Sequence, residues 1–283
     1  MRKPLSLAAV LLVTTNALAF PQSTHPAMLD PSKATTQAPE TFKAKFETTK
    51  GDVVFDCARA WAPHGVDRFY NLVRIGFFDD VALFRVAKGF VVQWGIHGDP
   101  KVSAVWQKAN IEPDPPKQSN ARGTLTYAMA GSPDTRSTQV FINTVDNAGL
   151  DSQGFAPICK VSEGMDVADK FYSEYGERVT GKQGPIAARG NAYLKEAWPS
   201  LDYIKKATIV GEPLDPQRGS KADDQTATTN EEAAAKDESS PVPWIIGIVV
   251  VVGLGAWFLR GKKEEPPPPP TKPEGKKKKK KKK

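Results

Sequence analysis

The sequence predicts an all-β dominated domain over residues 40–210, folded as a closed or nearly closed antiparallel barrel that two helices cap. Three observations lead to this class. Short strand-forming runs recur along this part of the chain. Only two of its segments place apolar residues at helical spacing. An apolar run beyond the domain has the length of a C-terminal transmembrane helix.

The domain opens with a predicted β-hairpin and a helix. In TFKAKFETTKGDVVFDCA, apolar and charged residues alternate on both sides of a Lys-Gly-Asp turn, which is typical of strands that bury one face. The first helix is expected over residues 66–76 (VDRFYNLVRIG), because its apolar residues lie at helical spacing and Gly76 is suited to end it.

The rest of the domain is predicted mainly as strands. They are LFRV, FVVQW, TLTYAM and QVFIN, at residues 83–86, 90–94, 124–129 and 139–143. A second helix is expected over about 165–175 (MDVADKFYSEY), and IKKATIV closes the domain as a strand.

Two segments at the ends of the chain are expected to lie outside the barrel. Residues 1–19 have a charged start, an apolar core and small residues before a cut after Ala19, which is the layout of a secretory signal peptide. Residues 20–39 are rich in Pro, Ser and Thr and lack periodicity, so they predict a flexible leader. Residues 211–243 predict a disordered spacer for the same reason.

The run WIIGIVVVVGLGAWFLR, residues 244–260, predicts a transmembrane helix with tryptophans near both ends. A Pro- and Lys-rich tail follows over residues 261–283. Since positive charge favours the cytoplasmic side, we expect a single-pass protein with a cytoplasmic tail. Its N-terminal domain would lie in the endoplasmic reticulum or secretory pathway of a eukaryote, or in the periplasm at a bacterial inner membrane.

The net charge of +7 is concentrated in the tail. Residues 260–283 hold twelve Lys and Arg against three Glu, so the domain is mildly acidic and no nucleic-acid partner is expected. Three interpretations of the tail stay open. It is a stop-transfer signal, or its lysines at 276–283 contact anionic lipid headgroups, or Lys280 and Lys281 form a sequence that resembles eukaryotic dilysine retrieval signals.

Three predicted strands carry a polar residue among apolar neighbours: Arg85, Gln93 and Gln139. Gln139 and Phe141 share a face because side chains alternate along a strand. Burying such groups is costly unless they find partners. A shallow cleft lined by phenylalanines, with a few convergent donors, would satisfy all three. The alternative is an ion pair of Arg85 with an aspartate at 79 or 80, and glutamines on a solvated face.

These residues stand in motifs that resemble the cyclophilin-type peptidyl-prolyl cis-trans isomerases. The motifs are FFDDVALFRVAKGFVVQWG, RGTLTYAMAGSPDTRSTQVFINTVDNAGLD and ICKVSEGMDVADKF, in this order. GNAYLKEAWPSLDYIKKATI resembles the longer C-terminal section of one group in the family. The resemblance covers residues 42–210. It implies a closed eight-stranded antiparallel barrel capped by two α-helices, and isomerisation of X–Pro bonds in polypeptide substrates during protein folding.

The resemblance also implies the site residues. The catalytic arginine of the family falls on Arg85. The positions implied to bind substrate are Phe90, Val91, Gln93, Ala130, Gly131, Gln139, Phe141 and Leu150. The apolar members would hold the proline ring, and the glutamines would hold the preceding backbone. A guanidinium is a permanently charged donor, so Arg85 would donate to the prolyl nitrogen or to the adjacent carbonyl.

Three positions depart from the family pattern. Phe84 stands where many members have His, Phe155 replaces a His that some members keep, and Gly149 stands where many have Trp or Phe. The last position matters more to cyclosporin-type inhibitors than to isomerisation. These departures leave a second function open, namely a proline-binding scaffold or chaperone of the same fold with little turnover.

No cofactor and no metal are expected. The three histidines are well separated, and the sequence holds no Cys/His cluster, GxSxG motif or P-loop. The chain has two cysteines, Cys57 and Cys159. An even number of cysteines in a domain expected to be secreted suggests a disulfide. In the barrel that the resemblance implies, their strands would be neighbours. Two free buried thiols are the alternative. We expect a monomer.

Overall fold

The structure is a computed structural model, and it describes residues 20–219. The expectations for the signal peptide (1–19), most of the spacer (220–243), the transmembrane helix (244–260) and the tail (261–283) lie outside these residues. Between residues 20 and 219, no helix is both long enough and apolar enough to span a bilayer.

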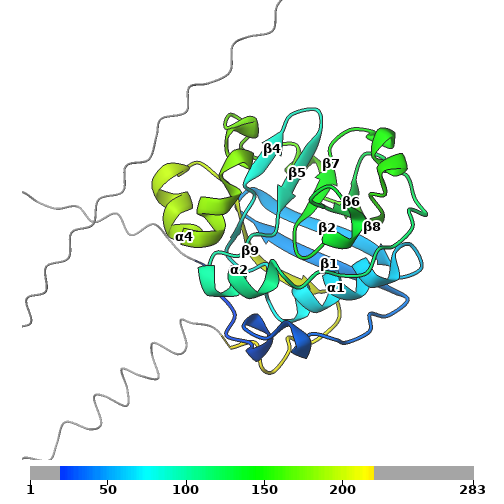
Figure 1. Cartoon of the computed structure of the whole chain (residues 1–283), viewed down its shortest axis with the longest axis horizontal. Coiled ribbons are helices and arrows are strands. Elements are labelled where there is room, and N and C mark those ends of the chain that lie inside the picture. Colours follow the sequence, from blue (N-terminus) through cyan, green and yellow to red (C-terminus); the bar gives the residue numbers. More distant parts are fainter. Residues whose placement is uncertain (1–19, 220–283) are drawn as a thin grey trace, which may run out of the picture. The chain divides into compact units, whose positions relative to one another are not determined.

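A single antiparallel sheet forms the body of the domain (Figure 1). It has nine strands in the order β3-β9-β1-β2-β8-β6-β7-β5-β4. The strands are β1 (Thr41–Thr48), β2 (Gly51–Ala58), β3 (Val81–Ala82), β4 (Arg85–Ala87), β5 (Val91–Trp94), β6 (Thr124–Tyr127), β7 (Val140–Asn143), β8 (Pro157–Glu163) and β9 (Tyr203–Ile209).

The prediction of a closed barrel of eight strands is wrong in two respects. The sheet has nine strands, and its order runs from β3 to β4 without pairing these two ends. The sheet opens within residues 83–86, the run predicted as one strand. Leu83 still follows β9, because its N–H donates to the carbonyl of Asp202 at 2.9 Å. Two residues later, Arg85 pairs with Gln93 of β5 instead.

The hairpin of β1 and β2 is confirmed, with Phe46 opposite Val53 and Thr48 opposite Gly51. Its inward side chains join an aromatic cluster with α1 and β5. The ring centroid of Phe46 lies 5.2 Å from that of Phe55 and 5.9 Å from those of Phe69 and Trp94. Each buried ring stabilises the fold by roughly 1.5–3 kcal/mol, so this cluster anchors β5, the strand that carries Gln93.

The helices agree only partly with the prediction. The first predicted helix is α1 (Pro63–Arg74), followed by Gly76 at φ 77°. The second is wrong, because α3 covers only Met165–Ala168. The chain leaves the helix there since Phe171 turns into the core and the Tyr172 N–H donates to the Asp202 carboxylate at 2.7 Å.

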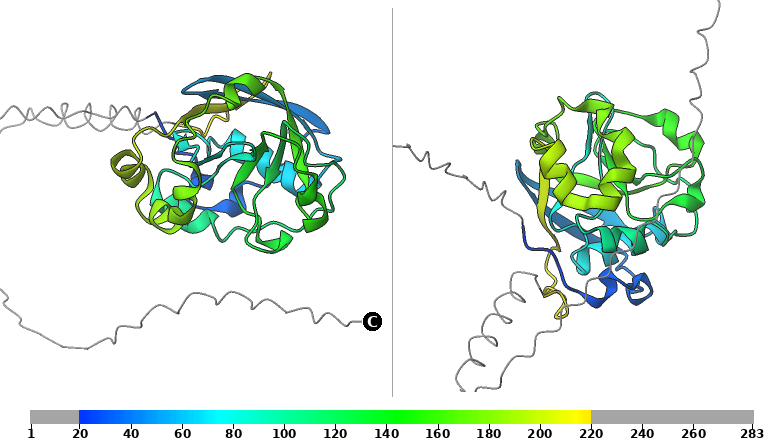
Figure 2. Two further views of the ribbon diagram at one scale, coloured as in Figure 1. Left: turned by 90° about the horizontal axis from the view of Figure 1, so that it is seen from above. Right: turned by 60° about the vertical axis from the view of Figure 1, so that its left-hand side comes forward.

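Two further helices were not predicted. They are α2 (Pro100–Trp106) and α4 (Gln183–Ala197), which pack against each other (Figure 2). Gly190 breaks the regular backbone of α4 with φ 58° and ψ −147°. A Cβ there would lie 1.9 Å from the carbonyl oxygen of Gly98, so only glycine fits this crossing. Short 3-10 helices are η1 (Pro26–Met28), η2 (Pro31–Lys33), η3 (Pro133–Thr135), η4 (Ala148–Gln153), η5 (Gly176–Arg178) and η6 (Thr180–Lys182).

Residues 20–39 differ from the flexible leader that the sequence predicts, because they pack on the domain. Ala27 and Met28 are buried, and the Trp106 indole N–H donates to the Met28 carbonyl at 3.0 Å. The first residues of the predicted spacer, 211–219, also return to the domain. There Arg218 donates to both carboxylate oxygens of buried Asp79 at 2.6 Å.

The predicted disulfide between Cys57 and Cys159 is confirmed. The two residues lie directly opposite each other on the adjacent strands β2 and β8. The bridge joins positions 102 residues apart in the sequence and therefore closes a long loop of the chain.

Candidate active site

Three neighbouring strands place the predicted site residues in one row. Arg85 of β4 lies opposite Gln93 of β5, and Gln93 lies opposite Phe141 of β7. Residues directly opposite in an antiparallel pair project from the same face of the sheet. The register therefore brings a cation, an amide and an aromatic ring together across the edge at which the sheet opens.

The Arg85 side chain is held by two partners and is 21% exposed. Its Nη1 donates to Oε1 of Gln93 at 3.0 Å. Its Nε and Nη2 both donate to Oε1 of Glu177, at 3.0 and 2.7 Å. The alternative of an ion pair with Asp79 or Asp80 is wrong, since Asp79 binds Arg218 and Asp80 accepts from the Asn191 side chain.

The glutamines form a relay that starts at Arg85. Nε2 of Gln93 donates to Oε1 of Gln139 at 2.9 Å, and Nε2 of Gln139 donates to Oε1 of Gln183 at 3.0 Å. Arginine only donates hydrogen bonds, so Gln93 must turn its oxygen towards Arg85 and its NH₂ group away. Gln139 must in turn present its oxygen to the NH₂ group of Gln93, so its own NH₂ group also points away from Arg85. Each amide NH₂ keeps a second N–H that the relay does not use.

Aromatic side chains form the apolar part of the site. The guanidinium carbon of Arg85 lies 5.3 Å from the centroid of the Phe90 ring. Phe141 is buried and meets Phe155 edge-on, with ring centroids 5.8 Å apart. The Phe155 N–H donates to the Leu150 carbonyl at 3.3 Å, which places half-buried Leu150 beside this pair.

The remaining predicted substrate contacts divide into a buried residue and an exposed loop. Val91 is buried in β5, two residues before Gln93. Ala130 and Gly131 are exposed, and Gly131 has φ 87° with no heavy atom within 4 Å of the position of a Cβ. The Ala130 N–H donates to the Thr135 hydroxyl at 2.7 Å, which closes the loop on itself.

A buried ion pair holds this loop against the domain. Arg136 and Asp114 are both 1% exposed, and both Nη atoms of Arg136 lie 3.2 Å from Oδ2 of Asp114. Arg136 also donates to the backbone carbonyls of Glu112 and Pro133. A buried charge without its partner is very costly, so this pair fixes the loop from which Gln139 extends.

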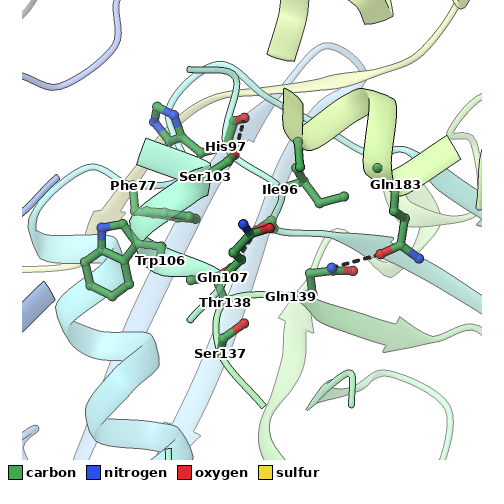
Figure 3. A pocket seen from close by; sticks show the side chains of 13 residues that line it. Phe77, Ile96, His97, Ser103, Trp106, Gln107, Ser137, Thr138, Gln139 and Gln183 are labelled. Carbon is green, nitrogen blue, oxygen red and sulfur yellow. Dashed lines mark hydrogen bonds between the residues drawn. The ribbon is translucent and has the colours of Figure 1, made fainter. Parts of the chain in front are cut away.

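A pocket of about 190 Å³ adjoins the row on the side of Gln139 (Figure 3). It lies between α2 and α4, with Trp106 and Gln107 on one side and Gln183 and Ala187 on the other. Figure 3 shows the hydrogen bond between Gln139 and Gln183 at its edge.

Comparison with known proteins identifies the family of this fold and site. The family model described as cyclophilin type peptidyl-prolyl cis-trans isomerase/CLD matches residues 43–188. The chain belongs to the cyclophilin-type peptidyl-prolyl cis-trans isomerases. Its activity is therefore the isomerisation of peptidyl-prolyl bonds, and peptides that contain proline are its substrates.

Two curated bacterial relatives support the assignment of this cyclophilin. Peptidyl-prolyl cis-trans isomerase B of Escherichia coli is 35% identical over 178 residues, which cover 59% of this chain and 98% of the relative. Peptidyl-prolyl cis-trans isomerase A of Dickeya dadantii is 35% identical over 158 residues, which cover 53% and 83%. A solved cyclophilin-type isomerase of Cryptosporidium parvum matches with a TM-score of 0.45 and 19% identity, over 61% of this chain and 99% of that one.

Two polar residues of this cyclophilin's site were missed by the sequence analysis. Glu177 lies in η5, within a stretch of turns and short 3-10 helices without any apolar period, and Gln183 is the first residue of α4. They reach residues 92 and 44 positions away in the sequence. The hydrogen bond from Arg85 holds the pKa of the Glu177 carboxyl below its ordinary value. Between residues 20 and 219, His, Cys, Asp and Glu side chains form no cluster of three suited to a metal.

Proposed function

We propose that Arg85 is the catalytic residue of this isomerase. The observation that supports the proposal is that a charged donor with unused N–H groups faces an apolar wall. Gln93 and Glu177 engage three of the five N–H groups of the guanidinium. Two donors remain for a peptide whose proline ring lies against Phe90 and Phe141.

The chemistry requires donors and a shape, and no group that forms a covalent bond. Resonance opposes rotation about the amide bond by about 18–20 kcal/mol. A donor aimed at the prolyl nitrogen localises its lone pair and so weakens that resonance. Each ~1.4 kcal/mol gained only by the twisted state accelerates the reaction about tenfold. Arg85 provides such a donor at a half-buried site, where hydrogen bonds from a charged group are strong.

The relay residues and the loop then hold the peptide on both sides of the proline. The unused N–H groups of Gln93 and Gln139 would donate to backbone carbonyls of the substrate. The exposed backbone at Ala130 and Gly131 would pair with the extended peptide. Val91 and Leu150 complete the apolar surface for the proline ring, beside Phe90 and Phe141.

The place of action that we propose is the lumenal or periplasmic side of a membrane, where the domain would assist the folding of other proteins. The sequence supports this with the predicted signal peptide (1–19), the apolar run (244–260) and the basic tail (261–283). The Cys57–Cys159 disulfide adds support, because structural disulfides persist in oxidising compartments. The lysines at 276–283 would then lie near the anionic headgroups of the opposite leaflet.

An isomerase assay on the full chain in detergent micelles tests the catalytic part, with an X–Pro tetrapeptide as substrate. We expect the parent to accelerate exchange, and Arg85→Ala to lower kcat/KM at least about tenfold. A folded parent that binds a proline peptide without accelerating its isomerisation would instead favour the proline-binding scaffold.

A protease-protection experiment tests the topology. In sealed membranes, the domain should resist protease added on the cytoplasmic side while an epitope on the tail is lost. Loss of the domain from the same membranes would refute the proposed orientation.

A further inference from the structure

The segment between α3 and α4 contributes a carboxylate to the candidate active site. Glu177 of η5 projects onto Arg85, and both hydrogen bonds from Arg85 end on its Oε1. The neighbouring acidic residue of this segment, Glu174, binds Lys88 at 2.8 Å instead. One segment thus places two similar carboxylates near the site, and only one of them touches Arg85.

The two partners of Arg85 use different edges of the guanidinium. Nε and Nη2 form the side-on edge and both donate to Glu177, whereas Nη1 donates to Gln93. A single bond to Gln93 would let the guanidinium plane rotate about that contact. Two bonds on the side-on edge fix the plane, and the Phe90 ring at 5.3 Å limits motion on one side.

This arrangement leaves two donors of the guanidinium available to substrate. One N–H on Nη1 and one on Nη2 are not used by Gln93 or Glu177. The direction of these two donors is set once the plane is fixed. Preorganised donors of this kind lower a barrier because they need no reorientation during the reaction.

Stability of the fold does not explain the contact. The Glu177 side chain is 57% exposed, and an ion pair with so exposed a partner contributes little to the free energy of unfolding. The Glu174 side chain is exposed to a similar degree, at 66%, so it serves as a matched control for the charge and exposure of Glu177.

We propose that Glu177 is a positioning residue for Arg85, which fixes the plane of the guanidinium so that its two remaining donors meet the twisted prolyl bond. The inference rests on the proposed catalytic role of Arg85. Because the contact orients a donor and binds no substrate, its loss should lower kcat and leave KM nearly unchanged.

The test measures kcat and KM of the full chain in detergent micelles with an X–Pro tetrapeptide. We expect Glu177→Ala to lower kcat about tenfold with a change in KM below about twofold. Glu177→Gln retains an acceptor oxygen and should recover part of that loss. The control Glu174→Gln should stay within about twofold of the parent, and all variants should unfold at the parent's temperature.

A double variant separates positioning from other effects. In the Arg85→Ala background, Glu177→Ala should have no further effect, because the residue it positions is gone. If Arg85→Ala lowers kcat while Glu177→Ala leaves it unchanged, the inference fails and the proposed function stands. If Glu177→Ala raises kcat, the carboxylate restrains Arg85 and the inference is overturned. Unchanged activity of Arg85→Ala would refute the proposed function itself.

Discussion

Gln93 lies in β5 and Gln139 directly precedes β7, and Nε2 of Gln93 donates to Oε1 of Gln139 at 2.9 Å. This bond is the centre of a relay that begins at Arg85 and ends at Gln183. Since Arg85 can only donate, the polarity of the whole relay depends on it. The orientation of the amides that would face a peptide is therefore set by the residue proposed to catalyse its isomerisation.

Replacement of Gln93 should impair activity more than stability. Gln93→Ala leaves the Nη1 group of Arg85 and the oxygen of Gln139 without the partners that they have now. Loss of a hydrogen bond to a charged group costs roughly 1.5–3 kcal/mol, so we expect kcat/KM to fall about 10- to 100-fold. The measurement is the isomerase assay, together with thermal unfolding as a control for the fold.

Gln93→Glu sharpens this test. A carboxylate would still accept from Arg85 but could not donate to Gln139. We expect it to recover little of the loss, because the relay is broken beyond position 93. Full activity of Gln93→Glu would show that only the contact with Arg85 matters.

The buried pair of Arg136 and Asp114 should be the most sensitive point of the loop that precedes Gln139. Asp114 also accepts from the backbone N–H groups of His64 and Gly65, at 3.1 and 2.8 Å, and so caps α1. Asp114→Ala would leave the Arg136 charge buried without its carboxylate partner, so we expect a loss of about 3–5 kcal/mol in the free energy of unfolding. Denaturant unfolding of the full chain in detergent measures it.

An exposed ion pair provides the control for this experiment. Lys43 and Asp56 lie 2.5 Å apart and are about half exposed, at 50% and 54%. Asp56→Ala should cost no more than about 1 kcal/mol. If Asp56→Ala and Asp114→Ala lower the free energy of unfolding by similar amounts, burial does not make the Arg136–Asp114 pair more important for stability than an exposed pair.

The disulfide should stabilise the domain mainly by restricting the unfolded chain. Cys57 and Cys159 are both buried, so alanine is a suitable replacement at both positions. For a loop of about 100 residues, we expect the double variant to lose about 2–4 kcal/mol in the free energy of unfolding. Unfolding in denaturant with and without a reductant measures it. The reductant should lower the stability of the parent and leave the double variant unchanged.

Sequence reasoning could find the parts of the site that lie on strands. Arg85, Gln93 and Phe141 are polar or aromatic positions in short apolar runs, and the period of two predicts a shared face for Gln139 and Phe141. The row of Arg85, Gln93 and Phe141 depends on the register between three strands, which the sequence pattern does not give. The family resemblance then points to their roles. The pairing of Cys57 with Cys159 likewise follows once their strands are taken as neighbours.

The contributions of η5 and of the start of α4 could not be predicted, because Glu177 and Gln183 act through tertiary contacts over long sequence distances. Gly184, Pro185 and Gly190 also weaken the helical signal of α4. The leader escaped prediction for a related reason. Its burial concerns single residues in short 3-10 turns, such as Ala27, and single residues produce no period.

Acid should weaken the parent isomerase through Glu177. The hydrogen bond from Arg85 lowers the pKa of this carboxyl below its ordinary value of 4.5. A group with a lowered folded pKa contributes fully above its unfolded pKa, and the contribution is lost as the pH falls through the folded pKa. The contact with Arg85 should therefore be complete from neutral pH down to about 4.5 and weaken only below that.

The other charged side chains near Glu177 bind groups other than Arg85. Protonation of Glu177 is therefore the change expected to alter the contact with Arg85. Lys88 and Glu174 bind each other, and Arg178 donates to the backbone carbonyls of Glu174 and Tyr175. The measurement is kcat/KM of the parent and of Glu177→Gln, on a peptide without titratable groups, at each pH where circular dichroism shows the fold intact. The ratio of parent to variant should be constant above pH 4.5 and approach one as the pH falls further. A constant ratio throughout would mean that the charge of Glu177 does not act on Arg85.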